Sequence, residues 1–197
     1  MDVLSHAIWG RHLTHHRIDW RLAAAMGVLP DLVAFVPSMI TQVVNGDVMT
    51  KVDENTVTAD LPAISWELYK ISHSLIWTFF LFLAIWGSLE MRLRRLDSGD
   101  QLPAGKWLQT SMSPRTAATF LIIPWVFHIF LDIPTHTIKF FPTPFLMPFS
   151  DFMVDGVGWS TWWVWGLNAV AFTVVWWLIR KNDAQRTAAM ASTAPRA

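Results

Sequence analysis

The stretch His128-Ile129-Phe130-Leu131-Asp132-Ile133-Pro134-Thr135-His136 is the point from which the rest of the chain can be interpreted. It follows directly on the apolar residues 119–127. Positions four apart lie on one face of an α-helix, so His128 and Asp132 should point the same way. Pro134 predicts that the helix ends before His136, which would otherwise extend that face. A divalent metal would satisfy both imidazoles and the carboxylate in an apolar segment; the alternative is a capping aspartate with two hydrogen-bonded histidines.

The composition around this stretch is that of a membrane protein. The 197 residues are 53% hydrophobic and 15% charged, with 13 Trp and 13 Phe, which is too apolar for a soluble domain of this length. The formal net charge is zero, so a nucleic-acid partner has no electrostatic support. The chain has no cysteine, which excludes thiolate metal sites. We therefore expect membrane lipids and a small-molecule or lipid substrate as partners.

Four apolar segments are each close to the ~20 residues that cross a bilayer. They are predicted at residues 22–40, 71–89, 117–134 and 159–179, and residues 2–12 could form a short amphipathic helix before them. The predicted fold is an all-α, polytopic membrane helix bundle with about four spans and a short N-terminal helix. It forms one domain over residues 1–181, followed by a disordered C-terminal tail at 182–197.

Basic residues in the connecting loops predict the orientation of these spans. The 90–116 loop and the C-terminal tail are basic and are therefore predicted to be cytoplasmic. The 41–70 and 135–158 loops carry only Lys51, Lys70 and Lys139 and are predicted to face outward. Four spans then place both termini in the cytoplasm.

Further ionisable residues lie in or beside the predicted spans. Asp31 follows Pro30 in the first span, where it marks a functional site or caps a half-helix after a break at the proline. His73 lies near the start of the second span. His6 begins on the cytoplasmic side and can reach the other groups only if residues 2–12 re-enter the membrane. The histidine-rich residues 11–17 could bind metal or form a solvated interfacial loop.

Four short motifs occur in an order that resembles bacterial membrane-bound metal-dependent hydrolases, a family described as LexA-binding and inner-membrane. They are Ser5-His6, Leu29-Pro30-Asp31, Ser72-His73-Ser74-Leu75 and His128-Ile129-Phe130-Leu131-Asp132. The resemblance covers about residues 1–160, and the family is distantly similar to zinc-dependent phospholipase C. The chain departs from the phospholipase pattern because it contains no His-x-x-x-Glu pair.

The resemblance implies a metal site and a hydrolytic reaction. The implied ligands are His6, Asp31, His73, His128 and Asp132, with His136 as a further one. Asp132 could bridge two ions, and Asp31 could be a ligand or a general base. The implied cofactor is one divalent ion or two, Zn²⁺ before Mn²⁺ or Fe²⁺. The implied substrate is a phosphoester, which could be lipid-linked, at the inner membrane of a bacterium.

Two other functions are compatible with the same residues. The chain could be a non-catalytic membrane protein whose metal is structural or sensed. It could also be a small ion or solute transporter lined by Asp31, His73, His128 and Asp132. A transport pathway needs polar groups along the whole depth of the membrane, whereas the third span is apolar before His128. This pattern favours the hydrolase and the metal-binding protein over the transporter.

Overall fold

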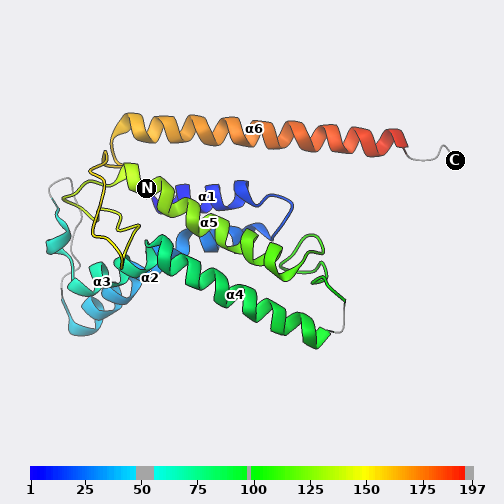
Figure 1. Ribbon diagram of the computed structural model, residues 1–197. Coiled ribbons are helices and arrows are strands. Elements are labelled where there is room, and N and C mark those ends of the chain that lie inside the picture. The colour runs from blue at the N-terminus through cyan, green and yellow to red at the C-terminus, as the bar shows by residue number, and fades with distance from the viewer. Residues whose placement is uncertain (48–55, 97–98, 194–197) are drawn as a thin grey trace.

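The computed structural model of the chain, shown in Figure 1, describes residues 1–47, 56–96 and 99–193. Within those ranges the regular structure is helical: α1 (Val3–Leu13), α2 (Trp20–Asn45), the short 3-10 helix η1 (Thr58–Asp60), α3 (Ala63–Ser72), α4 (Leu75–Leu96), α5 (Pro114–Thr135) and α6 (Trp162–Thr193). Helices α2, α4, α5 and α6 are long and apolar enough to cross a membrane. The predicted all-α bundle with four spans and a short N-terminal helix is confirmed.

The centre of the bundle is formed by α2 and α5. Helix α2 packs against α1, α3 and α5, and α5 also packs against α1 and α4. In Figure 1, α6 runs along one side of the bundle and α4 along the opposite side. Both outer helices expose large apolar side chains, such as Phe79 and Phe80 on α4 and Trp165 and Val170 on α6. Exposed apolar surface of this extent is expected of helices that face lipid.

The starts of three helices are fixed by their local sequence. Asp2, Asp19 and Ser113 cap α1, α2 and α5, each through a side-chain oxygen that accepts a hydrogen bond from a backbone N–H of the first turn. At the other end of α2, Gly46 adopts the left-handed conformation with φ of 73° that commonly terminates a helix.

Two prolines that were expected to break helices lie inside them. Pro30 is buried within α2, and the helix continues through it, so the predicted half-helix break is wrong. The lost backbone hydrogen bond is tolerated because neighbouring helices pack against α2 and hold it in place. Asp31 therefore projects from a continuous helix. Pro134 also lies inside α5, which ends one residue later, so His136 falls just outside the helix.

The second and fourth spans differ in their boundaries from the predicted ones. The second begins at Leu75, because Ser74 Oγ accepts hydrogen bonds from the backbone nitrogens of Ile76 at 3.1 Å and Trp77 at 3.3 Å. His73 consequently lies in the connection between α3 and α4. Helix α6 continues to Thr193, beyond residue 181, where the disordered tail was predicted to begin. Residues 182–193 lack Gly and Pro and are rich in alanine, the strongest helix former.

Parts of three predictions fall outside the described residues. These are residues 48–55 of the predicted outward-facing 41–70 loop, residues 97–98 of the predicted cytoplasmic 90–116 loop and residues 194–197 of the predicted tail.

The start of α1 and the end of α6 lie at opposite ends of the bundle (Figure 1). The amino nitrogen of Met1 contacts Asp132 near the end of α5. From there α1 runs toward the opposite end, where Ile18 pairs with Leu108, and α6 ends on that side as well. The assignment of both termini to the cytoplasm stays a prediction. Helix α1 packs against α2, α5 and α6 as an additional helix that is too short to span the bundle.

Two glycines allow α1 to approach α2 closely. A Cβ atom added to Gly10 would lie 2.4 Å from the carbonyl oxygen of Ala23, and one added to Gly27 would lie 2.4 Å from the carbonyl oxygen of His6. No side chain fits at those distances, so backbone touches backbone at both points. The contact at Gly27 sets the position of His6.

Candidate metal centre

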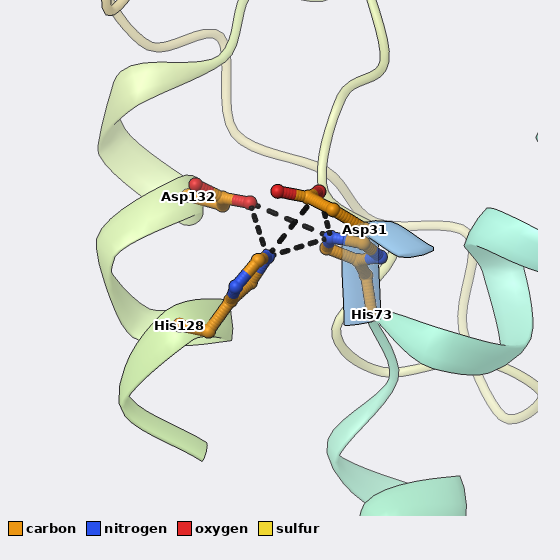
Figure 2. A group of neighbouring side chains, drawn as sticks. All are labelled: Asp31, His73, His128 and Asp132. Atoms are coloured by element: carbon orange, nitrogen blue, oxygen red, sulfur yellow. Dashed lines mark hydrogen bonds and ion pairs between the residues drawn. The ribbon is translucent and has the colours of Figure 1, made fainter. Parts of the chain in front are cut away.

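Four buried side chains from three parts of the chain meet at one point, as Figure 2 shows. Asp31 comes from α2, His73 from the α3–α4 connection, and His128 and Asp132 from successive turns of α5. His73 Nε2 lies 3.0 Å from His128 Nε2, and both ring nitrogens lie 3.5 Å from Asp31 Oδ1. Asp132 Oδ2 is 3.1 Å from His128 Nε2 and 3.5 Å from His73 Nε2.

These separations fit a tetrahedral metal ion. A Zn²⁺ ion holds imidazole and carboxylate donors at about 2.0–2.1 Å, which places the donor atoms of a tetrahedron about 3.3 Å from one another. The five donor pairs that include a histidine are 3.0–3.5 Å apart. Two imidazoles and two carboxylates also suit Mn²⁺ or Fe²⁺. The four groups can therefore hold a divalent metal.

The hydrogen bond made by His128 leaves its other ring nitrogen available to a metal. Its Nδ1 lies 2.7 Å from the carbonyl oxygen of Gly27 and must donate to it, because a carbonyl only accepts. In the neutral ring, Nε2 then carries a lone pair that faces two carboxylates. Asp132 Oδ2 is buried and makes no hydrogen bond within the described residues. A cation between them would satisfy acceptors that converge in a buried site.

His6 lies against this group from the side of α1. Its ring stacks on that of His128, with centroids 3.5 Å apart, and its Nε2 lies 3.2 Å from Asp132 Oδ1. Both ring nitrogens of His6 are buried and make no hydrogen bond in the described part of the chain. Burial lowers the pKa of His6 to about 4, so the ring is neutral near pH 7, which is the form that binds metal. His6 is thus placed to bind an ion that Asp132 shares.

His136 occupies the outer edge of the centre. Its Nδ1 lies 2.9 Å from the hydroxyl of Tyr69 and 3.9 Å from Asp132 Oδ2, so Tyr69 rather than the carboxylate is its direct partner. Burial lowers the pKa of His136 to about 3. Tyr69 also stacks on His73, with ring centroids 3.6 Å apart. This tyrosine therefore fixes two of the histidines at once.

The histidines are oriented by hydrogen bonds behind them. Ser72 Oγ lies 2.9 Å from His73 Nδ1, and the carbonyl oxygen of Ser72 accepts a hydrogen bond of 2.8 Å from the indole nitrogen of Trp125. On the other side, the Gly27 carbonyl holds His128. Partners of this kind fix the ring orientation and the tautomer of a metal-binding histidine.

A cavity of about 470 Å³ opens beside the centre. Asp31 and His136 line it, together with apolar side chains that include Phe35, Met39, Leu61, Phe140 and Trp159. The side chain of Asp31 is 12% exposed, whereas those of His73, His128 and Asp132 are 0% exposed. Asp31 is thus the member of the four that faces the cavity.

The other histidines lie away from this centre. His15 Nε2 and His16 Nε2 lie 3.0 Å and 2.8 Å from the two carboxylate oxygens of Asp183 on α6. This trio is partly exposed and could hold an ion, but each of these ring nitrogens already has a partner. His12 is not part of either group.

The sequence therefore predicted the candidate metal ligands but not the residues that fix the orientation of those ligands. The structure brings Asp31, His73, His128 and Asp132 together, places His6 against them and leaves His136 at the edge. Tyr69 and Gly27 were missed. Tyr69 is the single tyrosine of the chain and lies four residues before His73, which is a signal that could have found it.

Comparison with family models, with curated proteins and with solved structures gives no match for this chain.

Proposed function

We propose that this chain is a membrane-embedded, metal-dependent hydrolase that acts on a phosphoester. The observation that carries the proposal is the position of Asp31, which belongs to the buried donor group and also lines the neighbouring cavity. A structural site has no need of a donor that faces a cavity. The resemblance of the four motifs to membrane-bound metal-dependent hydrolases supports the same class of reaction.

His73, His128 and Asp132 would hold the metal, and His6 would join them through Asp132. A divalent ion bound there would lower the pKa of a water molecule and polarise a phosphoryl oxygen. Asp31 would accept the proton of the attacking water, because it is the carboxylate of the donor group that lines the cavity. His136, held by Tyr69 at the cavity wall, would orient the substrate by a hydrogen bond.

The lining of the cavity favours a substrate with an apolar part. Most of the lining residues are apolar, and Ser38, Gln42 and His136 are the uncharged polar ones among those described. A lipid-linked phosphoester would place its apolar chain against Phe35 and Met39 and its phosphate near Asp31. The inner membrane of a bacterium, with the cavity facing outward, would be the site of action.

The test is hydrolysis of a chromogenic phosphodiester by the purified protein in detergent. The wild type should be inactive after chelation and regain activity with Zn²⁺, Mn²⁺ or Fe²⁺. Asp31→Asn should lose most activity while it keeps more metal than His73→Ala, since His73 lies deeper. Failure of the reloaded wild type to cleave any phosphoester offered would remove the hydrolase proposal.

A structural or sensing metal site is the second candidate. The observation that favours it is that the four donors already suffice for a closed tetrahedral shell, as structural zinc sites have. Under this alternative, chelation would lower the thermal stability of the protein, and the metal-loaded protein would show no hydrolysis.

A further inference from the structure

A second cavity lies at the other end of the bundle, and the proposed hydrolysis makes no use of it. It encloses about 450 Å³ between α2, α4, α5 and the segment 102–108. This volume is within the range of sites that bury a small ligand. Its walls are largely apolar and include Leu22, Met26, Ile85, Leu89, Leu102 and Leu121.

Two basic residues stand at this otherwise apolar cavity. Arg92 on α4 and Lys106 in the 102–108 segment are the charged residues among its described lining, and neither is among the described ion pairs. Both side chains are exposed, so they can reach a ligand from the solvent side. The cavity therefore has an apolar interior and a positively charged mouth.

The mouth of the cavity lies near the end of a helix that is long and apolar enough to cross a membrane. Arg92 is four residues from the end of α4, which is long and apolar enough to cross a membrane. Lys106 Nζ lies 4.8 Å from the centre of the exposed Trp107 ring. Nearby, Arg17 lies over the ring of Phe120 at 5.3 Å. Basic residues paired with aromatic rings are typical of the membrane–water interface.

We propose that this cavity binds an anionic phospholipid of the membrane. An acyl chain would lie between α2, α4 and α5, and the phosphate of the headgroup would pair with Arg92 and Lys106. A zwitterionic lipid would bring its own cation to the two basic residues and bind less well. Basic pockets between membrane helices recognise anionic headgroups in this way.

This lipid site is separate from the metal centre. The cavity beside Asp31 shares no lining residue with it and has neither Arg nor Lys among its described lining residues. A lipid bound at Arg92 would therefore be a bound constituent of the fold rather than a substrate. Its presence does not depend on the proposed hydrolysis.

The experiment is native mass spectrometry of the full chain in a neutral detergent. Phosphatidylglycerol and phosphatidylcholine with the same acyl chains are added in turn. The wild type should retain phosphatidylglycerol at least about tenfold more strongly than phosphatidylcholine. The double variant Arg92→Ala/Lys106→Ala should weaken phosphatidylglycerol binding roughly 10- to 30-fold, because each basic residue contributes a factor of about five.

The matched control is Arg94→Ala/Arg95→Ala, which removes two exposed charges from the same end of α4 outside the cavity lining. This control variant should prefer phosphatidylglycerol over phosphatidylcholine to within about twofold of the wild-type ratio. Equal loss in both double variants, or equal retention of the two lipids by the wild type, would overturn the proposal. Millimolar glycerol phosphate should not displace the lipid, and displacement by it would contradict the role of the apolar cavity. Unchanged circular dichroism and metal content will show that the variants are folded.

Discussion

At the scale of single residues, the metal centre depends on groups that bind no metal themselves. The His128 imidazole presents its Nε2 lone pair to the centre because its Nδ1 donates to the Gly27 carbonyl at 2.7 Å. The His73 imidazole is held by Ser72 at 2.9 Å and by stacking on Tyr69. Removing such a partner leaves the ligand present but free to turn away.

Replacing Ser72 with alanine tests this dependence. Ser72→Ala should weaken metal binding by roughly 10- to 100-fold while the helical content stays the same, because His73 loses its orienting partner. The measurement is a titration of the metal-free protein against a metal-buffered chelator. Ser88→Ala, in which an exposed serine bonded to the backbone of its own helix is removed, is the control. An unchanged affinity in Ser72→Ala would show that Ser72 has no orienting role.

The sequence predicted the ligands better than their supports. His128 and Asp132 could be paired because a spacing of four residues places two side chains on one helix face. His6, Asp31 and His73 depended on the resemblance of short motifs. The contact between His128 and Gly27 spans 101 residues and joins a side chain to a backbone carbonyl, so no local pattern records it.

At the scale of elements, the close contact of α1 and α2 brings His6 to the centre. Gly27→Ala would place a methyl group 2.4 Å from the His6 carbonyl oxygen and force the helices apart. We expect a loss of about 1–3 kcal/mol in stability and weaker metal binding. Both can be measured by thermal unfolding in detergent and by metal titration.

The control for this prediction is Gly87→Ala on α4, where an added Cβ meets nothing within 4 Å. It should keep the metal affinity and be as stable as the wild type or up to about 1 kcal/mol more stable, because alanine is the better helix former. Equal melting temperatures for Gly27→Ala and the wild type would refute the tight α1–α2 contact.

A buried asparagine joins helix α6 to α1. Asn168 Oδ1 accepts a hydrogen bond of 2.9 Å from Trp9 Nε1, and its Nδ2 donates one of 2.8 Å to Ser5 Oγ. Asn168→Ala leaves the buried indole N–H unpaired and should lower the stability by about 1–3 kcal/mol.

Because none of the metal donors lies on α6, Asn168→Ala should bind as much metal as the wild type. Thermal unfolding and elemental analysis of the same sample separate these two effects, and the exposed Asn182→Ala should change neither. If Asn168→Ala lost both bound metal and thermal stability, α6 would take part in forming the metal centre.

The existence of the long helices could be predicted from the sequence, but their ends could not. Apolar length located all four spans. The predicted break at Pro30 failed because packing of α2 in the bundle outweighs one lost hydrogen bond, an effect that local sequence does not contain.

At the scale of the whole molecule, the start of α1 and the end of α6 lie at opposite ends of the bundle. The chain has no cysteine, so single cysteines can be introduced and labelled from either side of a membrane. Val3→Cys and Asp151→Cys should react from one side, and Asp100→Cys and Arg186→Cys from the other. Labelling of Val3→Cys from the same side as Asp100→Cys would contradict the path of α1.

The count of basic residues in the loops could not predict the path of α1 through the bundle. The rule for basic loops orients segments that span the membrane, and α1 with its 11 residues covers only about 16 Å at 1.5 Å per residue. The assignment of the N-terminus to the side of the basic loops therefore did not take account of α1, which begins beside Asp132.

The central claim is that a divalent metal occupies the buried group of Asp31, His73, His128 and Asp132. The most direct test is elemental analysis of the purified chain, with bound metal counted per molecule. The wild type should carry one or two transition-metal ions. Asp132→Asn, which keeps the shape of the side chain but removes its charge, should lose most of them, and the exposed Asp151→Asn should keep them. A wild type without stoichiometric metal after purification and metal loading, or an Asp132→Asn variant with a full complement, would contradict the account.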